Sequence, residues 1–225
     1  MRLFLKVINL VQIIKCTLLF FVIIISGSAC DKSETAPPVI TIQGSNPDVV
    51  ILGSDTTYAD PGAVANDNSG SNLTVSVSGT VNMFSAGDYS IKYSATDAAG
   101  IIGEATRTVI VDGGQYLSGN YTVEDFTGTV SNGTYPETID APTICPNKIY
   151  FSKFAFHVNG TVYGTISGTI ITIPTQTITC GCPEAERTFS GTGTFTTANP
   201  ATFTIHYSEI SNGHTVQGHG VYSLI

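Results

Sequence analysis

The sequence predicts an all-β protein with two successive domains, over residues 38–112 and 116–225. No long stretch places apolar residues at helical spacing, and Gly, Thr, Ser and Val are abundant. Short alternating runs are separated by dipeptides that favour tight hairpins, among them Asn159-Gly160 and Asn212-Gly213. The expected architecture is a β-sandwich followed by an antiparallel β-meander, which closes as a barrel or folds as a second sandwich.

The first 29 residues have the features of a secretory signal peptide. Three basic residues occur among the first 15, and the apolar run at 18–25 is short for a membrane span. Small residues at 27–29 directly precede Cys30, and a polar stretch that ends in Pro37-Pro38 follows. An uncleaved helical anchor is the alternative interpretation.

This segment resembles the signal peptide and lipobox of bacterial lipoproteins. The resemblance implies that residues 1–29 are removed, that Cys30 is acylated, and that residues 30–37 tether the first domain to a membrane. We therefore expect a lipid-anchored protein of the outer membrane that faces the cell surface.

The charge of the chain after residue 29 excludes one class of partner. All 17 acidic residues but only six of the nine basic residues lie there, which gives a formal net charge of −11. Such a surface repels nucleic acid, and no cluster of basic residues offsets it. We expect no nucleic-acid partner.

Three cysteines follow the predicted lipidation site: Cys145, Cys180 and Cys182. Because exported proteins fold in an oxidising compartment, a disulfide from Cys145 to Cys180 or Cys182 is expected, with one thiol left over. A metal site with a histidine as fourth ligand is the alternative, supported only by a Cys-x-Cys pair and one distant cysteine. We expect neither a metal nor a cofactor.

The first domain is expected to contain at least five short strands. Alternating or apolar runs occur at 39–42, 49–52, 73–77, 89–94 and 106–111. Turn residues separate these runs, which is typical of a small sandwich. We interpret the aspartates at positions 60, 67, 88 and 97 as turn residues that bond local backbone, rather than as calcium ligands.

An ordered series of motifs in this domain resembles the immunoglobulin-like module of bacterial surface proteins. The motifs are Pro38-Val39-Ile40-Thr41-Ile42, Tyr58-Ala59-Asp60-Pro61-Gly62-Ala63, Asp67-Asn68, Gly87-Asp88-Tyr89 and the segment 93–100. The resemblance covers residues 38–111 and implies an immunoglobulin-like sandwich that serves as a spacer or presents another domain.

The second domain is rich in aromatic residues, with seven of the ten tyrosines and seven of the eleven phenylalanines. Its candidate strands are 120–124, 149–158, 161–166, 169–173, 188–195, 201–210 and 214–224. Alternation places Phe203, Ile205 and Tyr207 on one side of their strand and His206 on the other. Most of the rings are therefore expected in the core.

Segments of this domain rich in Gly, Thr and Ile resemble the C-terminal β domains of Bacteroidetes lipoproteins. The resembling segments are 117–123, 164–174 and 189–195. Such proteins often accompany outer-membrane glycan-uptake systems, so the resemblance implies a glycan-binding accessory. It transfers no defined binding residue.

The sequence contains no nucleophile motif, phosphate-binding loop or cofactor fingerprint. His214 and His219 are five residues apart on one predicted strand, so they face opposite sides and do not share a metal. A hydrolytic pair would have to come from the carboxylates at 124, 125, 137, 140, 184, 186 and 209. An acidic domain carries such residues in any case, and we expect no enzymatic activity.

Three functions remain to be compared. The leading hypothesis is a non-enzymatic accessory that binds a glycan through its second domain, with an outer-membrane protein as a further partner. The alternatives are a structural lipoprotein that contacts another protein without a small ligand, and a carboxylate-dependent hydrolase.

Sugar sites favour exposed rings beside hydrogen-bonding side chains, which selects three candidate ligand residues. Tyr135, in the segment 131–136, is expected as an exposed loop ring, the alternative being a ring folded over the barrel end. Tyr163 and His206 follow, because their strands carry Thr-rich faces.

Overall fold

The computed structural model describes residues 36–157, 161–181 and 184–225. Strands and one short helix make an all-β fold, as the sequence predicts, and Pro37–Ile225 forms one compact unit. The predicted signal peptide, the lipidation residue Cys30 and most of the tether lie outside the described residues. In the described ranges, no helix is long and apolar enough to cross a membrane.

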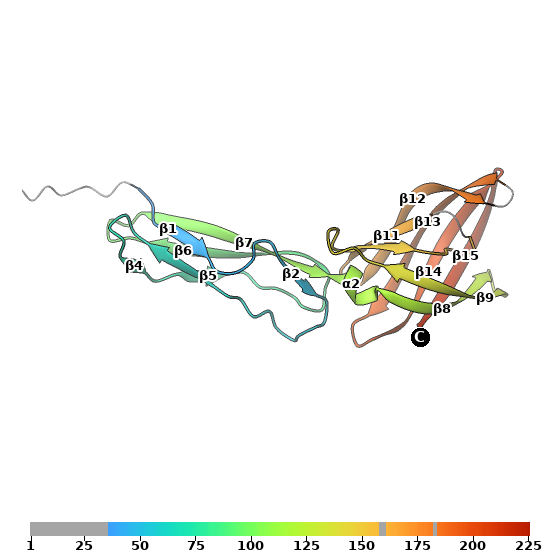
Figure 1. The fold of residues 1–225 in the computed structure, drawn as a ribbon, viewed down its shortest axis with the longest axis horizontal. Helices are drawn as coiled ribbons and strands as arrows, with labels where there is room; N and C mark the ends of the chain where they lie inside the picture. Colours follow the sequence, from blue (N-terminus) through green and yellow to red (C-terminus); the bar gives the residue numbers. More distant parts are fainter. Residues whose placement is uncertain (1–35, 158–160, 182–183) are drawn as a thin grey trace, which may run out of the picture. The chain divides into compact units, whose positions relative to one another are not determined.

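Two sheets form the sandwich of the first half (Figure 1). One sheet has the strand order β1-β3-β4, with the bounds Val39–Ile42, Ala63–Asn66 and Asn72–Leu73. The other has the order β2-β7-β6-β5, with the bounds Asp48–Ile51, Ile102–Asp112, Gly87–Thr96 and Ser76–Ser78. β6 and β7 form a long hairpin, and β2 joins β7 in parallel. The sequence does not predict β3, a run of only four residues.

A buried cation, Arg107, organises the interior of this sandwich. Its side chain is fully buried; Nε donates to the Tyr93 hydroxyl at 3.0 Å and lies 3.4 Å from Asp60 Oδ1. Its terminal nitrogens donate to the backbone oxygens of Gln43, Ser45 and Gly62. Asp60 and Gly62 belong to the Tyr-Ala-Asp-Pro-Gly-Ala motif, which thus supplies the partners that a charge at this depth needs.

Eight antiparallel strands form a closed barrel in the second half, which decides between the two architectures expected there. They are β8 (Gly119–Thr127), β9 (Val130–Asp140), β10 (Lys148–Phe151), β11 (Val162–Ser167), β12 (Ile170–Gly181), β13 (Glu184–Thr196), β14 (Asn199–Ser211) and β15 (His214–Leu224). Each strand pairs with the next along the chain, and β15 pairs with β8 to close the ring (Figure 1).

Two segments of the barrel differ from the sequence-based expectation. The loop expected around residues 131–136 is part of β9, where Pro136 pairs with Thr122 despite its missing amide hydrogen. The strand expected at 149–158 ends at Phe151. A tight turn follows, in which Ala155 and Phe156 have φ angles of 49° and 64°. Such angles are rare for residues with bulky side chains, and no glycine signals this turn.

Aromatic rings fill the barrel interior. The Phe154 ring centroid lies 5.4 Å from that of Phe189 and 5.3 Å from that of Tyr207, both edge-to-face. Phe203 stacks on Tyr222 with centroids 4.7 Å apart. An eight-stranded barrel is just wide enough for side chains to fill it. The described interior is packed core, which confirms the expectation that most rings are buried.

A short helix, α2 (Gly113–Leu117), occupies the joint that the sequence predicts between the domains. Asp112 caps it, because its Oδ1 accepts from the amides of Gly114 at 2.8 Å and Gln115 at 3.3 Å. The amide of Asn147 donates to the same oxygen at 2.8 Å. Leu117 belongs to the same buried apolar cluster as Val111 and Leu52 of the first half. Apolar packing therefore continues through the joint, while the exact domain boundary stays a prediction.

Candidate functional site

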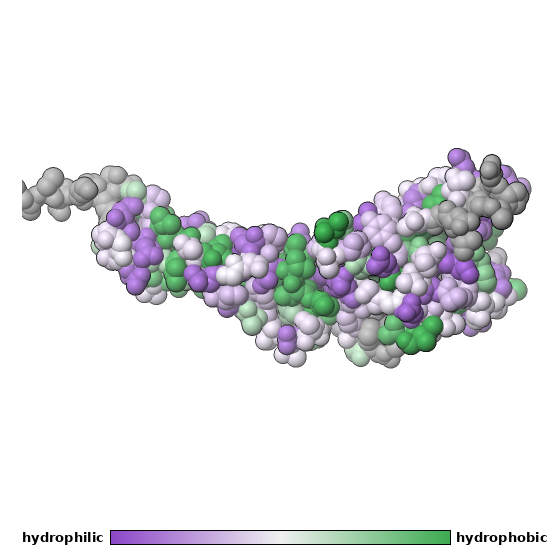
Figure 2. Space-filling view, viewed as in Figure 1, coloured by the Kyte–Doolittle hydropathy of each residue, from purple (hydrophilic) through white to green (hydrophobic). Residues whose placement is uncertain are grey.

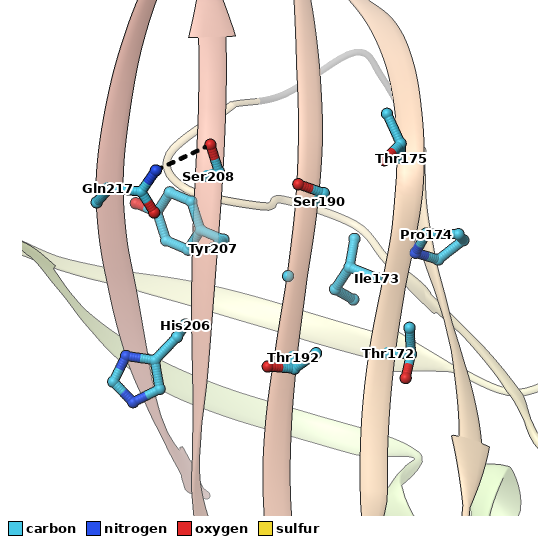
Figure 3. A pocket seen from close by; sticks show the side chains of 11 residues that line it. Thr172, Ile173, Pro174, Thr175, Ser190, Thr192, His206, Tyr207, Ser208 and Gln217 are labelled. Atoms are coloured by element: carbon cyan, nitrogen blue, oxygen red, sulfur yellow. Dashed lines mark hydrogen bonds between the residues drawn. The ribbon is translucent and has the colours of Figure 1, made fainter.

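An open groove of about 550 Å³ lies on the barrel's outer face, across β12, β13, β14 and β15 (Figure 3). Its polar lining comes from Thr172, Thr175, Ser190, Thr192, His206, Ser208 and Gln217. Gln217 Nε2 donates to Ser208 Oγ at 3.2 Å (Figure 3). A volume of this size suits a small ligand or part of a larger one.

Strand alternation explains why these side chains share one face. Ile205 and Tyr207 are buried inside the barrel, so His206 and Ser208 point outward, which confirms the predicted faces of this strand. The register places Ser190 opposite Ser208 and Thr192 opposite His206. Gly191 lies between them, and a Cβ there would come within 2.5 Å of the His206 carbonyl oxygen. Glycine is thus required for the close approach of β13 and β14.

A row of three rings borders the groove. His206 on β14 lies opposite His219 on β15, which lies opposite Phe126 on β8. The His219 and Phe126 rings stack with centroids 4.7 Å apart and planes only 4° apart. The His206 and His219 centroids are 5.3 Å apart. His206 is exposed and the other two rings are half-buried, so the row presents aromatic surface beside the hydroxyl groups of the groove.

Tyr163, the second predicted ligand residue, is half-buried on the outer face of β11, opposite Tyr150. The Lys148 ammonium lies 4.2 Å from the Tyr163 ring centroid and 5.1 Å from that of Tyr150. The amide of Tyr163 donates to Gln176 Oε1 at 3.0 Å, and Gln176 Nε2 donates to the carbonyl oxygens of Tyr163 at 2.8 Å and Pro174 at 3.1 Å. Because Pro174 lines the groove, Tyr163 lies next to the β12 wall.

Tyr135 is not the exposed loop ring that the sequence predicts. It lies in β9, its side chain is 3% exposed, and its hydroxyl accepts from the amide of Ala155 at 3.0 Å. Burial raises the pKa of this hydroxyl. The Phe156 ring packs on it with centroids 4.6 Å apart. The ring is part of the buried core and presents no outer face to a ligand.

Two carboxylates face the barrel interior, Asp125 and Glu137, each 2% exposed. The Tyr207 hydroxyl donates to Asp125 Oδ1 at 2.7 Å. Glu137 Oε1 accepts from the Ser152 hydroxyl at 2.8 Å, whereas Oε2 is buried without a hydrogen-bond partner. Burial raises the pKa of Glu137 to about 7. These two acids therefore lie inside the barrel, away from the groove lining.

The other carboxylates considered for hydrolysis do not line the groove either. Glu209 forms ion pairs with Arg187 and with His157. Burial alone would raise the pKa of Glu209, but the hydrogen bonds and charges of these two partners hold it below its usual range. The exposed acids are Glu124, Asp140 and Glu186. The side chain of Glu184 lies outside the described part.

No disulfide is found among the described residues, in which Cys145 is a free cysteine. Lys148, the first residue of β10, pairs with Thr165 on β11, which pairs with Thr172 on β12. Both pairings are antiparallel, so β10 and β12 run in the same direction. Cys145 precedes Lys148, whereas Cys180 lies beyond Thr172 by eight residues, or about 26 Å at the rise of a strand. Disulfide-bonded residues need Cα atoms within about 7 Å, so Cys145 does not reach Cys180. Cys182 lies outside the described residues.

Two aspartates of the sandwich act as turn residues, as the sequence predicts. Asp67 Oδ1 accepts from the amides of Ser69 at 2.9 Å and Ser71 at 2.8 Å. Asp97 Oδ1 accepts in the same pattern, from the amides two and four residues later. Within the described ranges, no group of three or more His, Cys, Asp or Glu side chains is placed to hold a metal ion.

Sequence reasoning missed the aromatic row, although it selected His206. The row depends on the pairing of β15 with β8, which lie about a hundred residues apart and meet only when the barrel closes. One signal was available: His219 has the opposite parity to Tyr222 on the same strand, which places it outside if Tyr222 is core.

Comparison with known proteins assigns the first half. Residues 40–111 match the family model of the bacterial surface protein Ig-like domain. This match confirms the resemblance seen in the motifs and fits a protein of the bacterial cell surface. It covers less than half of the chain and leaves the barrel unassigned.

No curated protein matches the chain. The crystal structure of a lipoprotein from Bacteroides thetaiotaomicron is similar, with 20% identity and a TM-score of 0.32 over 82% of this chain and 98% of that chain. A TM-score at this level supports no argument about the function of the barrel.

Proposed function

We propose that this protein is a non-enzymatic lipoprotein of the outer membrane that binds a glycan at the cell surface. In this proposal residues 1–29 direct export, acylated Cys30 anchors the protein, and the immunoglobulin-like half is a spacer. The groove on the outer face of the barrel holds the glycan.

The observation that carries the proposal is the row of rings beside a hydroxyl-lined groove. A sugar presents hydroxyl groups at its rim and apolar C–H groups on its faces, so it needs both kinds of partner. The groove offers the hydroxyls of Thr172, Thr192 and Ser190 together with the amide of Gln217. The exposed His206 ring adds an aromatic surface at the same place.

A binding role is favoured over a hydrolytic one by the chemistry of the groove lining. Glycoside hydrolysis uses two carboxylates on either side of the scissile bond. The polar side chains of the groove are hydroxyl, imidazole and amide groups. These groups form hydrogen bonds with a sugar without supplying the acid and the nucleophile or base.

A binding role is also favoured over purely structural contact with another protein. In the view of Figure 2, the apolar surface residues form separate groups between hydrophilic and neutral ones. A protein that acts only by docking on a partner presents a contiguous apolar patch. An outer-membrane protein of a glycan-uptake system remains part of the proposal, as the partner that receives the glycan.

The test is a glycan array probed with the full-length protein in detergent, with two histidine variants. His206→Ala removes the ring in the groove, whereas His214→Ala removes an exposed histidine at the start of β15 and serves as the control. We expect a ligand to bind modestly, since sugar hydroxyls exchange water for protein at small net gain. His206→Ala should weaken that binding about tenfold, or about 1.4 kcal/mol, and His214→Ala should leave it unchanged.

The proposal fails if the wild-type protein binds no glycan on the array. It also fails if both histidine variants bind as tightly as wild type, because the groove would then not be the site.

A further inference from the structure

The ammonium group of Lys148 lies on β10, two strands beyond the β12 edge of the groove. Lys148 takes part in none of the ion pairs formed within the described ranges. It lies over the rings of Tyr163 and Tyr150, each of which attracts a cation through its π face. A hydrogen bond with Tyr150 is the largest cause that raises the pKa of Lys148, so the side chain stays charged at physiological pH.

A row of threonines leads from this ammonium group into the groove. The register places Lys148 opposite Thr165 on β11 and Thr165 opposite Thr172 on β12. Thr172 in turn lies opposite Thr192 on β13. Because neighbouring strands are about 4.8 Å apart, the backbone of Lys148 is only about 10 Å from that of groove-lining Thr172. All three threonines are exposed, so the path carries hydroxyl groups from the groove to the cation.

Gln176 holds the Tyr163 end of this arrangement in place. Its amide group bonds both backbone polar atoms of Tyr163 and also the carbonyl of Pro174, as described above. It does so where the β12–β13 ladder shifts register between Ile173 and Gln176. The backbone of Tyr163 is therefore tied to that of Pro174 in the groove wall by hydrogen bonds. The Lys148 ammonium lies over the Tyr163 ring in the absence of a ligand.

We propose that the ligand of the groove is an acidic carbohydrate and that Lys148 binds its carboxylate or sulfate group. This inference rests on the proposed function and adds the chemical class of the glycan. The hydroxyls and the imidazole of the groove bind the neutral sugars of this carbohydrate. The anionic substituent reaches over β12 to the ammonium group above Tyr163.

Because the protein carries a net negative charge, binding of an acidic ligand depends on where a positive charge such as Lys148 lies. The whole chain has a formal net charge of −8, so an acidic ligand is repelled by most of the surface. Of the other described lysines and arginines, Lys92 pairs with Glu104, Arg107 with Asp60 and Arg187 with Glu209. Lys153 lies beyond the far end of β10, over the ring of Tyr135. An acidic sugar in the groove therefore depends on one local cation, and replacing that residue should abolish the preference for acid.

The experiment uses an array on which neutral mannans, galactans, glucans and xylans stand beside their uronate-containing or sulfated counterparts. The full-length protein is probed as wild type, Lys148→Met, Lys148→Arg and Lys153→Met. Methionine keeps the apolar stem of lysine and removes the charge. Lys153→Met is the matched control, because Lys153 also stands over a ring, that of Tyr135, at 5.7 Å, beyond the far end of β10.

We expect wild type to prefer acidic members and Lys148→Met to bind them at least about threefold more weakly, which is the scale of a solvent-exposed ion pair. Lys148→Arg should retain the preference, and Lys153→Met should match wild type. Unchanged melting temperatures would show that the loss is not unfolding.

If the wild-type protein binds neutral glycans as tightly as their acidic counterparts, the inference about acidic carbohydrate is wrong, while glycan binding itself stands. The same conclusion follows if Lys148→Met still binds acidic glycans more tightly than neutral ones. Absence of binding to every member would overturn the proposed function, and this inference with it.

Discussion

The sandwich buries a cation, Arg107, whose nitrogens are all paired, whereas the barrel buries a carboxylate, Glu137, with one unpaired oxygen. The sandwich has a small apolar cluster in which Ile91, Tyr93 and Val109 are the buried members, and it places a whole guanidinium group inside. Every nitrogen of Arg107 meets a hydrogen-bond acceptor. The barrel has a much larger aromatic core. Two described carboxylate oxygens are buried without a hydrogen-bond partner, Asp97 Oδ2 in the sandwich and Glu137 Oε2 in the barrel.

The difference in how well these two buried charges are paired predicts how the loss of each one changes stability. Removing one member of a well-paired buried charge network leaves the others unpaired, which costs several kcal/mol. Removing a poorly paired buried charge should instead raise the free energy of unfolding, because the cost of taking that charge out of water is no longer incurred. We therefore expect removal of the Arg107 charge to destabilise the protein and removal of the Glu137 charge to stabilise it. Three substitutions test this contrast.

The largest effect is expected for Arg107→Met, which should destabilise the protein by about 3–5 kcal/mol. It leaves the Asp60 carboxylate, the Tyr93 hydroxyl and three backbone carbonyls without their donor. Urea denaturation at pH 7 measures the change. Lys92→Met is the control, since its ion pair with Glu104 is about half exposed and is worth less than about 1 kcal/mol. If both variants lost the same free energy of unfolding, the buried cation would be no more important for stability than the exposed one.

Glu137→Gln should stabilise the protein by about 3 kcal/mol at pH 8 and leave its stability unchanged at pH 4. The pKa of Glu137 is raised from 4.5 to about 7, so the folded state holds the proton more tightly than the unfolded state. That contribution is complete below pH 4.5 and is lost as the pH rises through 7. Denaturation of wild type and variant across this range measures it. A difference that does not vary with pH would show that Glu137 is not the group responsible.

The smallest of the three effects is expected for Tyr207→Phe, at about 2 kcal/mol of destabilisation. The variant removes the hydroxyl that donates to the buried carboxylate of Asp125 at 2.7 Å, a hydrogen bond to a charged group. The ring and its contacts with Phe154 and Phe189 remain. Tyr163→Phe, on the outer face, is the control and should change the unfolding free energy by less than about 0.5 kcal/mol. No loss in Tyr207→Phe would mean that Asp125 is adequately satisfied without this donor.

The order of strands in the barrel was predictable because its hairpins carry local signals. Gly168 and Gly213 have the positive φ angles that tight turns require, and each joins two strands that pair. β9 was not predictable in this way. It carries Gly133, Pro136 and an inward-facing Glu137, three features that ordinarily argue against a strand with one buried face. Its assignment depends on β8 and β10, which pair with it from either side.

The candidate site was predictable only within single strands. Alternation placed His206 outside and Tyr207 inside, and both positions are confirmed. Tyr135 was not predictable in this way, because Gly133 and Pro136 beside it are typical of a loop although the segment is part of β9. The disulfide was inferred from the compartment alone, and no local pattern reports that Cys145 and Cys180 lie toward opposite ends of a barrel. The separation of these two cysteines along the barrel follows only from the pairing register of β10, β11 and β12.

The pairing of β15 with β8 also sets an order in time. Gly218 pairs with Thr127 and Leu224 with Tyr121, contacts that close a loop of about a hundred residues and cost more chain entropy than any hairpin in the barrel. Hairpins between sequential strands form as each strand becomes available, but the ring stays open until β15 is present. Until then β8 and the most recent strand are unpaired edges. A chain that lacks residues 214–225 would therefore expose these edges to neighbouring chains, and pairing of the last strand removes both edges at once.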